Sequence, residues 1–185
     1  MTKLLIDYAN KNNIVLKMNE KDIIKWYPLL LSVHNNNIEM TKLLMDYATE
    51  NNVILKINEQ DNEGDYLFSL TTYKNNVEMT KLLIDYANKN NIILRINEKD
   101  KDGNYPILRS IFNNNTEMTE ILVNYASKNS IILKFLDKRN ILNYNEDYIF
   151  LSHINELIIK YDPRVFLKMI DCFDGKIKFI IYINF

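Results

Sequence analysis

Residue types that commonly carry out chemistry are sparse in this chain, and they are not spaced to act together. The two histidines, His34 and His153, lie far apart in a chain of 185 residues. Cys172 is the single cysteine, so no disulfide can form within the chain. No glycine-rich phosphate loop, serine-based triad or metal-ligand spacing is found. We therefore expect no enzymatic activity, no cofactor and no metal.

Acidic residues recur at regular intervals, which favours a structural role over a catalytic one. They are Asp22, Asp61 and Asp100, each before a turn, and Glu39, Glu78 and Glu117, each near the start of a helix. A carboxylate near a helix N-terminus complements the helix dipole. We interpret both sets as parts of the fold.

Composition excludes two kinds of partner. With 23 basic and 24 acidic residues the net charge is -1, which does not suit binding to a phosphate backbone, so we expect no nucleic-acid partner. No apolar stretch approaches the roughly 18 residues of a membrane span, and the first residues lack the order of a signal peptide. We expect no membrane partner and a cytoplasmic location, with the nucleus left open.

The chain repeats itself every 39 residues. Positions that recur at this interval are Met1, Met40, Met79 and Met118, and Tyr27, Tyr66, Tyr105 and Tyr144. The interval predicts an array over residues 1–161, with a partial unit 1–22, full units 23–61, 62–100 and 101–139, and a degenerate unit 140–161. A divergent tail follows at residues 162–185.

Each unit predicts a short helix, a polar turn and a longer helix. Residues 28–33 and 106–111 begin with proline, which suits the first position of a helix. Asparagine runs at 35–37 and 113–115 can adopt left-handed backbone and cap the next helix. The apolar face of that longer helix is formed by Met40, Leu43, Leu44, Tyr47 and Ala48.

A finger should connect each long helix to the next unit. Ile92, Leu94 and Ile96 alternate with more polar residues, as in a half-buried strand. Asp102 and Gly103 then supply a turn before the next short helix.

These features resemble the ankyrin repeat. Residues 100–110 look like that family's turn and first-helix start, and residues 116–122 look like its second helix. The resemblance implies an all-α fold, an ankyrin-like solenoid of stacked helix pairs with hairpin-like fingers. Helix-pair solenoids of the HEAT or armadillo kind are the structural alternative, because their periods are longer than the 33 residues or so of ankyrin.

The chain departs from the family at two sets of positions. Tyrosine replaces the family's threonine, and Leu30, Ser69 and Leu108 replace its histidine, so apolar packing should replace the usual Thr–His hydrogen bonds. The family ends its second helix with glycine, whereas this chain has alanine at 48, 87 and 126. Alanine favours helix, so we expect each helix to run on toward the asparagines at 51–52, 90–91 and 129.

The first unit lacks a short helix, which leaves an apolar face formed by Leu4, Leu5 and Tyr8 without a preceding repeat. Because stacked arrays need polar caps, this face implies a longer chain, a frayed helix, or self-association through the uncapped N-terminal repeat.

The resemblance implies that a partner binds the concave face, at the finger tips and the exposed side of the first helices. The positions carried over are Ile23, Ile24, Trp26, His34, Asp65, Tyr73, Lys74, Lys101, Asn104 and Phe112. His34, Tyr73 and Phe112 share one repeat position, so they form either an aromatic ladder for a partner or packing between first helices.

We expect a non-catalytic scaffold for an unidentified protein or peptide. Two alternatives stay open: a fragment or regulatory repeat region of a larger multidomain protein, with or without an enzyme domain, and a degenerate repeat remnant without function.

Overall fold

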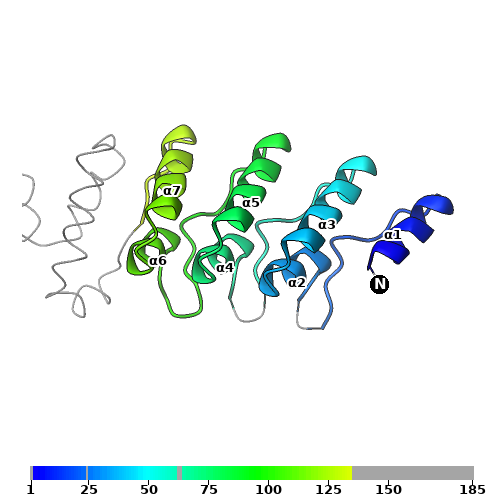
Figure 1. The fold of residues 1–185 in the computed structure, drawn as a ribbon, viewed down its shortest axis with the longest axis horizontal. Coiled ribbons are helices and arrows are strands. Elements are labelled where there is room, and N and C mark those ends of the chain that lie inside the picture. The colour runs from blue at the N-terminus through cyan, green and yellow to red at the C-terminus, as the bar shows by residue number, and fades with distance from the viewer. Residues whose placement is uncertain (1, 24, 62–63, 135–185) are drawn as a thin grey trace, which may run out of the picture. The chain divides into compact units, whose positions relative to one another are not determined.

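The computed structural model describes residues 2–23, 25–61 and 64–134. Within these ranges it contains seven helices and no strand, which confirms the all-α fold class. The helices are α1 (Thr2–Lys11), α2 (Pro28–His34), α3 (Ile38–Glu50), α4 (Leu67–Tyr73), α5 (Val77–Lys89), α6 (Pro106–Phe112) and α7 (Thr116–Lys128) (Figure 1). None of these helices is long and apolar enough to cross a membrane. The degenerate unit 140–161 and the tail 162–185, with His153 and Cys172, lie outside the described residues.

Short and long helices pair as the repeat predicts. The chain divides into two compact units, Met1–Arg95 and Ile96–Phe185. In the first, α2 packs against α3 and α4 against α5, while α2 also packs against α4 and α3 lies between α1 and α5 (Figure 1). In the second, α6 packs against α7. The boundaries that we assigned to the individual repeats stay a prediction.

Asparagines begin each long helix, as expected. The side chains of Asn37, Asn76 and Asn115 accept hydrogen bonds from the backbone N–H groups three residues later, at 2.8–2.9 Å. The residue before each cap, Asn36, Asn75 or Asn114, has a positive φ of 55°, 54° or 49°. Asparagine tolerates this left-handed conformation better than most residues, and an asparagine cap stabilises a helix by about 1 kcal/mol.

The long helices also end where the sequence predicted. They extend past the alanines to Glu50, Lys89 and Lys128, and the next asparagine closes each one. The side-chain amides of Asn51, Asn90 and Asn129 donate to the carbonyl oxygens of Tyr47, Tyr86 and Tyr125 at 2.8–2.9 Å. These bonds satisfy carbonyl groups that the helix end leaves without an intrahelical donor.

Buried hydroxyl pairs join each short helix to its long helix. The pairs are Ser32 with Thr41, Thr71 with Thr80 and Ser110 with Thr119, at oxygen–oxygen distances of 2.8, 2.8 and 2.9 Å. Each pair satisfies two polar groups that would otherwise be buried without a partner, and so it fixes the register of the two helices.

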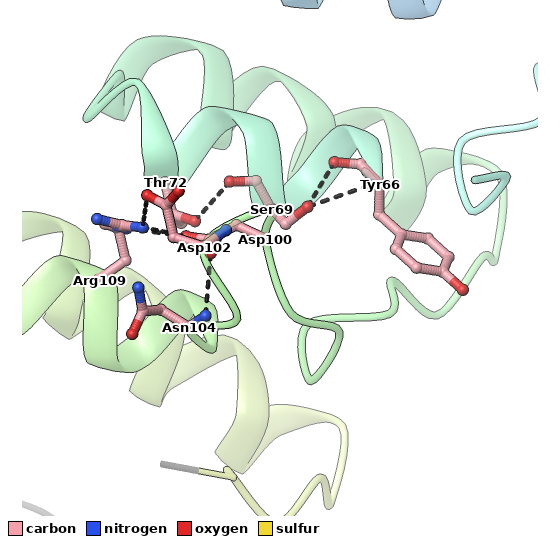
Figure 2. Close-up of polar contacts among 7 residues, drawn as sticks. All are labelled: Tyr66, Ser69, Thr72, Asp100, Asp102, Asn104 and Arg109. Carbon is pink, nitrogen blue, oxygen red and sulfur yellow. Dashed lines mark hydrogen bonds and ion pairs between the residues drawn. The ribbon is translucent and has the colours of Figure 1, made fainter. Parts of the chain in front are cut away.

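The expected apolar substitute for the Thr–His bonds is found in two repeats but not in the third. Leu30 and Leu108 are fully buried. Ser69 instead accepts a hydrogen bond from the backbone N–H of Tyr66 and donates to its carbonyl oxygen, at 3.1 and 2.9 Å (Figure 2). The prediction was wrong for this repeat because the serine hydroxyl bonds to the backbone at the start of α4.

The interpretation of residues 92–96 as a strand was also wrong, although the expected alternation is present. Leu94 and Ile96 are buried and Ile93 is exposed, but no strand forms in the described part of the chain. The amide of Asn58 bonds the backbone instead, donating to the carbonyl of Ile93 at 2.8 Å and accepting from the N–H of Arg95 at 3.0 Å. A side chain thus takes the place of a partner strand.

The same two bonds recur one repeat earlier and one repeat later. Asn19 bonds Ile54 and Lys56 in this way, and Asn97 bonds Ile132 and Lys134. These asparagines were not predicted from the sequence, although their 39-residue spacing was a visible signal.

Candidate functional site

The three recurrent aspartates hold the turns at the finger tips. Asp61 and Asp65 pair through their backbones, and the carboxylate of Asp61 accepts a hydrogen bond from the N–H of Asp65 at 2.9 Å. Asp22 binds the N–H of Trp26 in the same way at 2.8 Å. Asp100 binds the N–H of Asn104 at 2.9 Å. These bonds support the structural interpretation of the three carboxylates.

Arg109 in α6 ties one finger to its short helix (Figure 2). Its Nε donates to Asp100 at 2.8 Å, and a terminal nitrogen donates to Asp102 at 2.7 Å. Burial lowers the pKa of Arg109, but the hydrogen bonds and charges of the two aspartates outweigh burial and raise it. The neighbouring predicted site residues, Lys101 and Asn104, therefore lie on a finger with a fixed conformation.

Two of the predicted site residues come together in the first unit. The ring centroids of Trp26 and His34 lie 4.6 Å apart, with the planes tilted by 48°. Both side chains are half-buried. Ile23, on the same finger, is 98% exposed. Ile24 lies outside the described residues. Finger and short helix thus present an aromatic pair beside an exposed aliphatic residue.

The other predicted positions differ in their accessibility. Tyr73 and Lys74, at the end of α4, are half-buried. In the second unit Lys101 is exposed, Asn104 is half-buried and Phe112 is 37% exposed. All five expose part of their side chain, as a binding position must.

Asp65 is the exception among the predicted positions. It is 3% exposed, and its N–H is bound by Asp61. We therefore correct its assignment to the exposed surface, because the residue is buried.

Tyrosines link successive repeats of the first unit. The hydroxyl of Tyr27 donates to the carbonyl of Lys56 at 2.8 Å. Burial raises the pKa of this tyrosine, and the negative charges of Glu59 and Asp61 raise it further. A hydrogen bond from Lys21 lowers the pKa of Glu59. Tyr27, Lys21 and Glu59 therefore hold neighbouring repeats together and are part of the fold.

A groove of about 720 Å³ opens beside α1 and α2. Its apolar lining includes Leu5 and Ile6 from α1, Trp26 and Leu31 from around α2, and Met40 from α3. The apolar face of α1 was one visible signal of this groove in the sequence, whereas the contribution of α2 was not visible. In the described ranges no cluster of histidine, cysteine or acidic side chains is suited to a metal ion.

Helix pairs that recur at a fixed interval and share buried faces with their neighbours define a repeat protein. Residues 72–123 match a family model described as ankyrin repeats (many copies). The resemblance is thereby confirmed for residues 72–123, and the match favours ankyrin repeats over HEAT or armadillo pairs. No curated protein matches the chain. Ankyrin repeats generally mediate protein–protein interactions, and the family is typically non-enzymatic.

Proposed function

We propose that the chain is a non-catalytic scaffold that binds a partner protein or peptide through the finger and short-helix positions of its repeats, the concave face in the ankyrin resemblance. In the first unit these positions are Ile23, Trp26, His34, Tyr73 and Lys74, and in the second they are Lys101, Asn104 and Phe112. Ile24 belongs to the same set by sequence.

The observation that carries this proposal is the contact of Trp26 with His34 beside the exposed Ile23. Partly exposed aromatic side chains on a fixed backbone are typical anchors of protein interfaces, because they bury a large area at a small cost in side-chain entropy. The recognition positions also differ from repeat to repeat, whereas the buried helix faces recur. This contrast is expected of a surface that is selected for a partner and not for the fold.

The charges around these positions are mixed. Lys74 and Lys101 are basic, and Asp102 is acidic. A partner without strong net charge fits this surface, and its binding should depend only moderately on salt. We place the interaction in the cytoplasm, because a single cysteine suits a reducing compartment.

The test has two steps: capture of partners on the full chain, and measurement of the affinity of each for designed variants. Replacing Trp26, Tyr73 and Phe112 together by alanine should lower the affinity of a true partner by more than about tenfold, because loss of each hot-spot residue costs about 2 kcal/mol of binding free energy. The matched control replaces Asp46, Asp85 and Asn124, which lie on exposed positions of the long helices. Equal affinities of a folded triple variant and its control would refute the proposal.

The same experiment separates the alternatives. A degenerate remnant would bind no partner that distinguishes the triple variant from its control. A regulatory region of a larger protein would bind a segment of that protein instead of a separate partner.

A further inference from the structure

The tips of the three fingers share one closed turn. In each, the carboxylate of Asp22, Asp61 or Asp100 accepts a hydrogen bond from the backbone N–H four residues later, at 2.8–2.9 Å. The N–H of each aspartate donates to the carbonyl oxygen of that same later residue, at 2.8, 3.1 and 2.9 Å. The residue before the later one is left-handed in every finger, with φ of 60°, 89° and 82° at positions 25, 64 and 103. The backbones are therefore alike, and the fingers differ in the side chains that they carry.

The first finger carries apolar and basic side chains where the others carry polar residues or glycine. Its sequence after Asp22 is Ile23, Ile24, Lys25 and Trp26. The corresponding residues of the next two fingers are Asn62, Glu63, Gly64 and Asp65, and Lys101, Asp102, Gly103 and Asn104. Ile23 is 98% exposed. The ring of Trp26 is half-buried against His34, with centroids 4.6 Å apart. The first finger thus exposes an apolar side chain that the shared turn does not need.

Lys25 occupies a left-handed position where the other two fingers have glycine. A residue with a Cβ adopts this conformation less readily than glycine, so the lysine costs stability. Unfavourable backbone conformations of this kind tend to be kept where the side chain has a function. The strain at Lys25 therefore directs attention to its side chain.

The ammonium of Lys25 is the available charge of this finger. The residue is exposed, and it forms no ion pair with another residue of the described ranges. The neighbouring charges are already used, because Lys21 binds Glu59 and the carboxylate of Asp22 holds the N–H of Trp26. A single cation thus lies between exposed Ile23 and the aromatic pair along the finger.

We propose that residues 22–26 recognise an acidic side chain in a partner peptide, and that Lys25 binds its carboxylate. Ile23 and Trp26 would contact an apolar residue next to that acidic residue. This inference rests on the proposed function, and it specifies the chemistry of the partner at one of the proposed positions. One carboxylate also agrees with a partner that has no strong net charge, since an ion pair at an interface mainly fixes orientation and specificity.

An anionic membrane fits the finger less well than a peptide. An apolar loop with a basic residue could lie on a lipid surface, but recognition of anionic lipids usually takes a cluster of about four to eight basic residues. In this finger Lys21 is bound to Glu59, so Lys25 would act alone. Membrane binding is therefore one outcome of the test and not the proposal.

The experiment selects a displayed library of random peptides on the full chain. We expect the enriched peptides to share an aspartate or glutamate next to an apolar residue. Fluorescently labelled synthetic copies then give affinities by anisotropy. A copy in which asparagine or glutamine replaces the acidic residue should bind the native chain more weakly. The same replacement should have little further effect on binding to Lys25→Gly, because the two changes remove one interaction.

Variants of Lys25 separate its charge from its backbone. Lys25→Glu should lower the peptide affinity at least about tenfold, because like charges then meet, whereas Lys25→Arg should stay within about twofold. The matched control is Lys3→Glu, which makes the same change of charge at an exposed position of α1. Lys25→Gly should lower the affinity while it raises the urea midpoint of unfolding. A purely structural lysine would move stability and binding in the same direction.

Four results would overturn this inference. They are enrichment of no peptide, enriched peptides without an acidic residue, equal affinities of Lys25→Glu and Lys3→Glu, and binding to phosphatidylserine vesicles that Lys25→Glu abolishes. Peptides that lose affinity on Trp26→Ala but not on Lys25→Glu would refute the role of Lys25 and leave the proposed function standing. Peptides that bind the Trp26, Tyr73 and Phe112 triple variant as well as its control would count against both.

Discussion

Two helices of the first unit share one sequence but not one environment. Residues 2–14 and 80–92 are identical residue for residue. Leu5 and Tyr8 in α1 are 53% and 59% exposed, whereas the same residues in α5, Leu83 and Tyr86, are 0% and 5% exposed. Local sequence therefore specifies a helix with an apolar face, but only the neighbouring elements decide whether that face is buried.

The neighbours account for the difference. The short helix α4 packs against α5, and α5 packs against α3. No short helix is paired with α1 in the described ranges, and α1 packs against α3. Asn76 also caps the start of α5. The same residues should therefore contribute very differently to stability. Two predictions test this contrast, and two smaller ones concern the link and the finger between the two helices.

The largest expected effect is the loss of a core leucine. Leu83→Ala should lower the free energy of unfolding by about 2–5 kcal/mol, because it leaves a cavity in the core. Leu5→Ala should change it by less than about 0.5 kcal/mol, the usual range for exposed sites. Urea denaturation of both variants measures the contrast. Equal losses would show that α1 is buried in solution, and Lys81→Ala on the exposed face of α5 is the control for the helix itself.

The tyrosine hydroxyls should give a smaller contrast. The hydroxyl of Tyr86 accepts a hydrogen bond from the N–H of buried Leu55 at 2.9 Å. Tyr86→Phe leaves that N–H without its acceptor and should cost about 1–3 kcal/mol. Tyr8→Phe should cost almost nothing, because the side chain is largely exposed. Thermal or urea unfolding checks both, and a costly Tyr8→Phe would indicate a bound partner for α1.

Alkaline pH should weaken the link that buried Tyr27 makes to the next repeat. The free energy of unfolding should fall by about 1 kcal/mol per pH unit once the unfolded tyrosine titrates. Burial raises the pKa of Tyr27, so the folded state holds the proton more tightly than the unfolded state. The stability from this proton is complete below about pH 10 and is lost as the pH rises above it. The advantage of the native chain over Tyr27→Phe should therefore be constant from about pH 7 to about pH 10 and smaller at about pH 11. An equal difference in stability between the two chains at about pH 10 and at about pH 11 would show that folding does not raise the pKa of Tyr27.

The smallest effect concerns the finger that follows α1. Lys25 has a φ of 60° at the position where the next two repeats have Gly64 and Gly103, with φ of 89° and 82°. A left-handed conformation costs a residue with a side chain about 1–2 kcal/mol relative to glycine, partly offset by the greater freedom of glycine when unfolded. Lys25→Gly should therefore stabilise the chain by up to about 1 kcal/mol. Chemical denaturation measures this gain, and Gly103→Ala should have the opposite sign.

Much of the fold was predictable because it depends on local rules. The asparagine caps follow from side-chain geometry within four residues, and the helix ends follow from replacement of glycine by alanine at positions such as Ala48 and Ala87. The finger at residues 92–96 was not predictable in the same way. Alternation showed which residues are buried, but it did not reveal that Asn58, 35 residues from Ile93, would bond the backbone in place of a strand.

The candidate site also combines features that the sequence determines with features that depend on tertiary structure. The sequence by itself determined a 39-residue repeat of helix pairs, the variable positions on its fingers and the apolar face of α1, because periodicity and residue type are properties of the chain. Only the tertiary structure decided that Asp65 is buried, that Trp26 meets His34, and that Leu5 and Leu31 line one groove. Burial depends on which elements cover a residue. Identical segments in α1 and α5 therefore have the same helix and different surfaces.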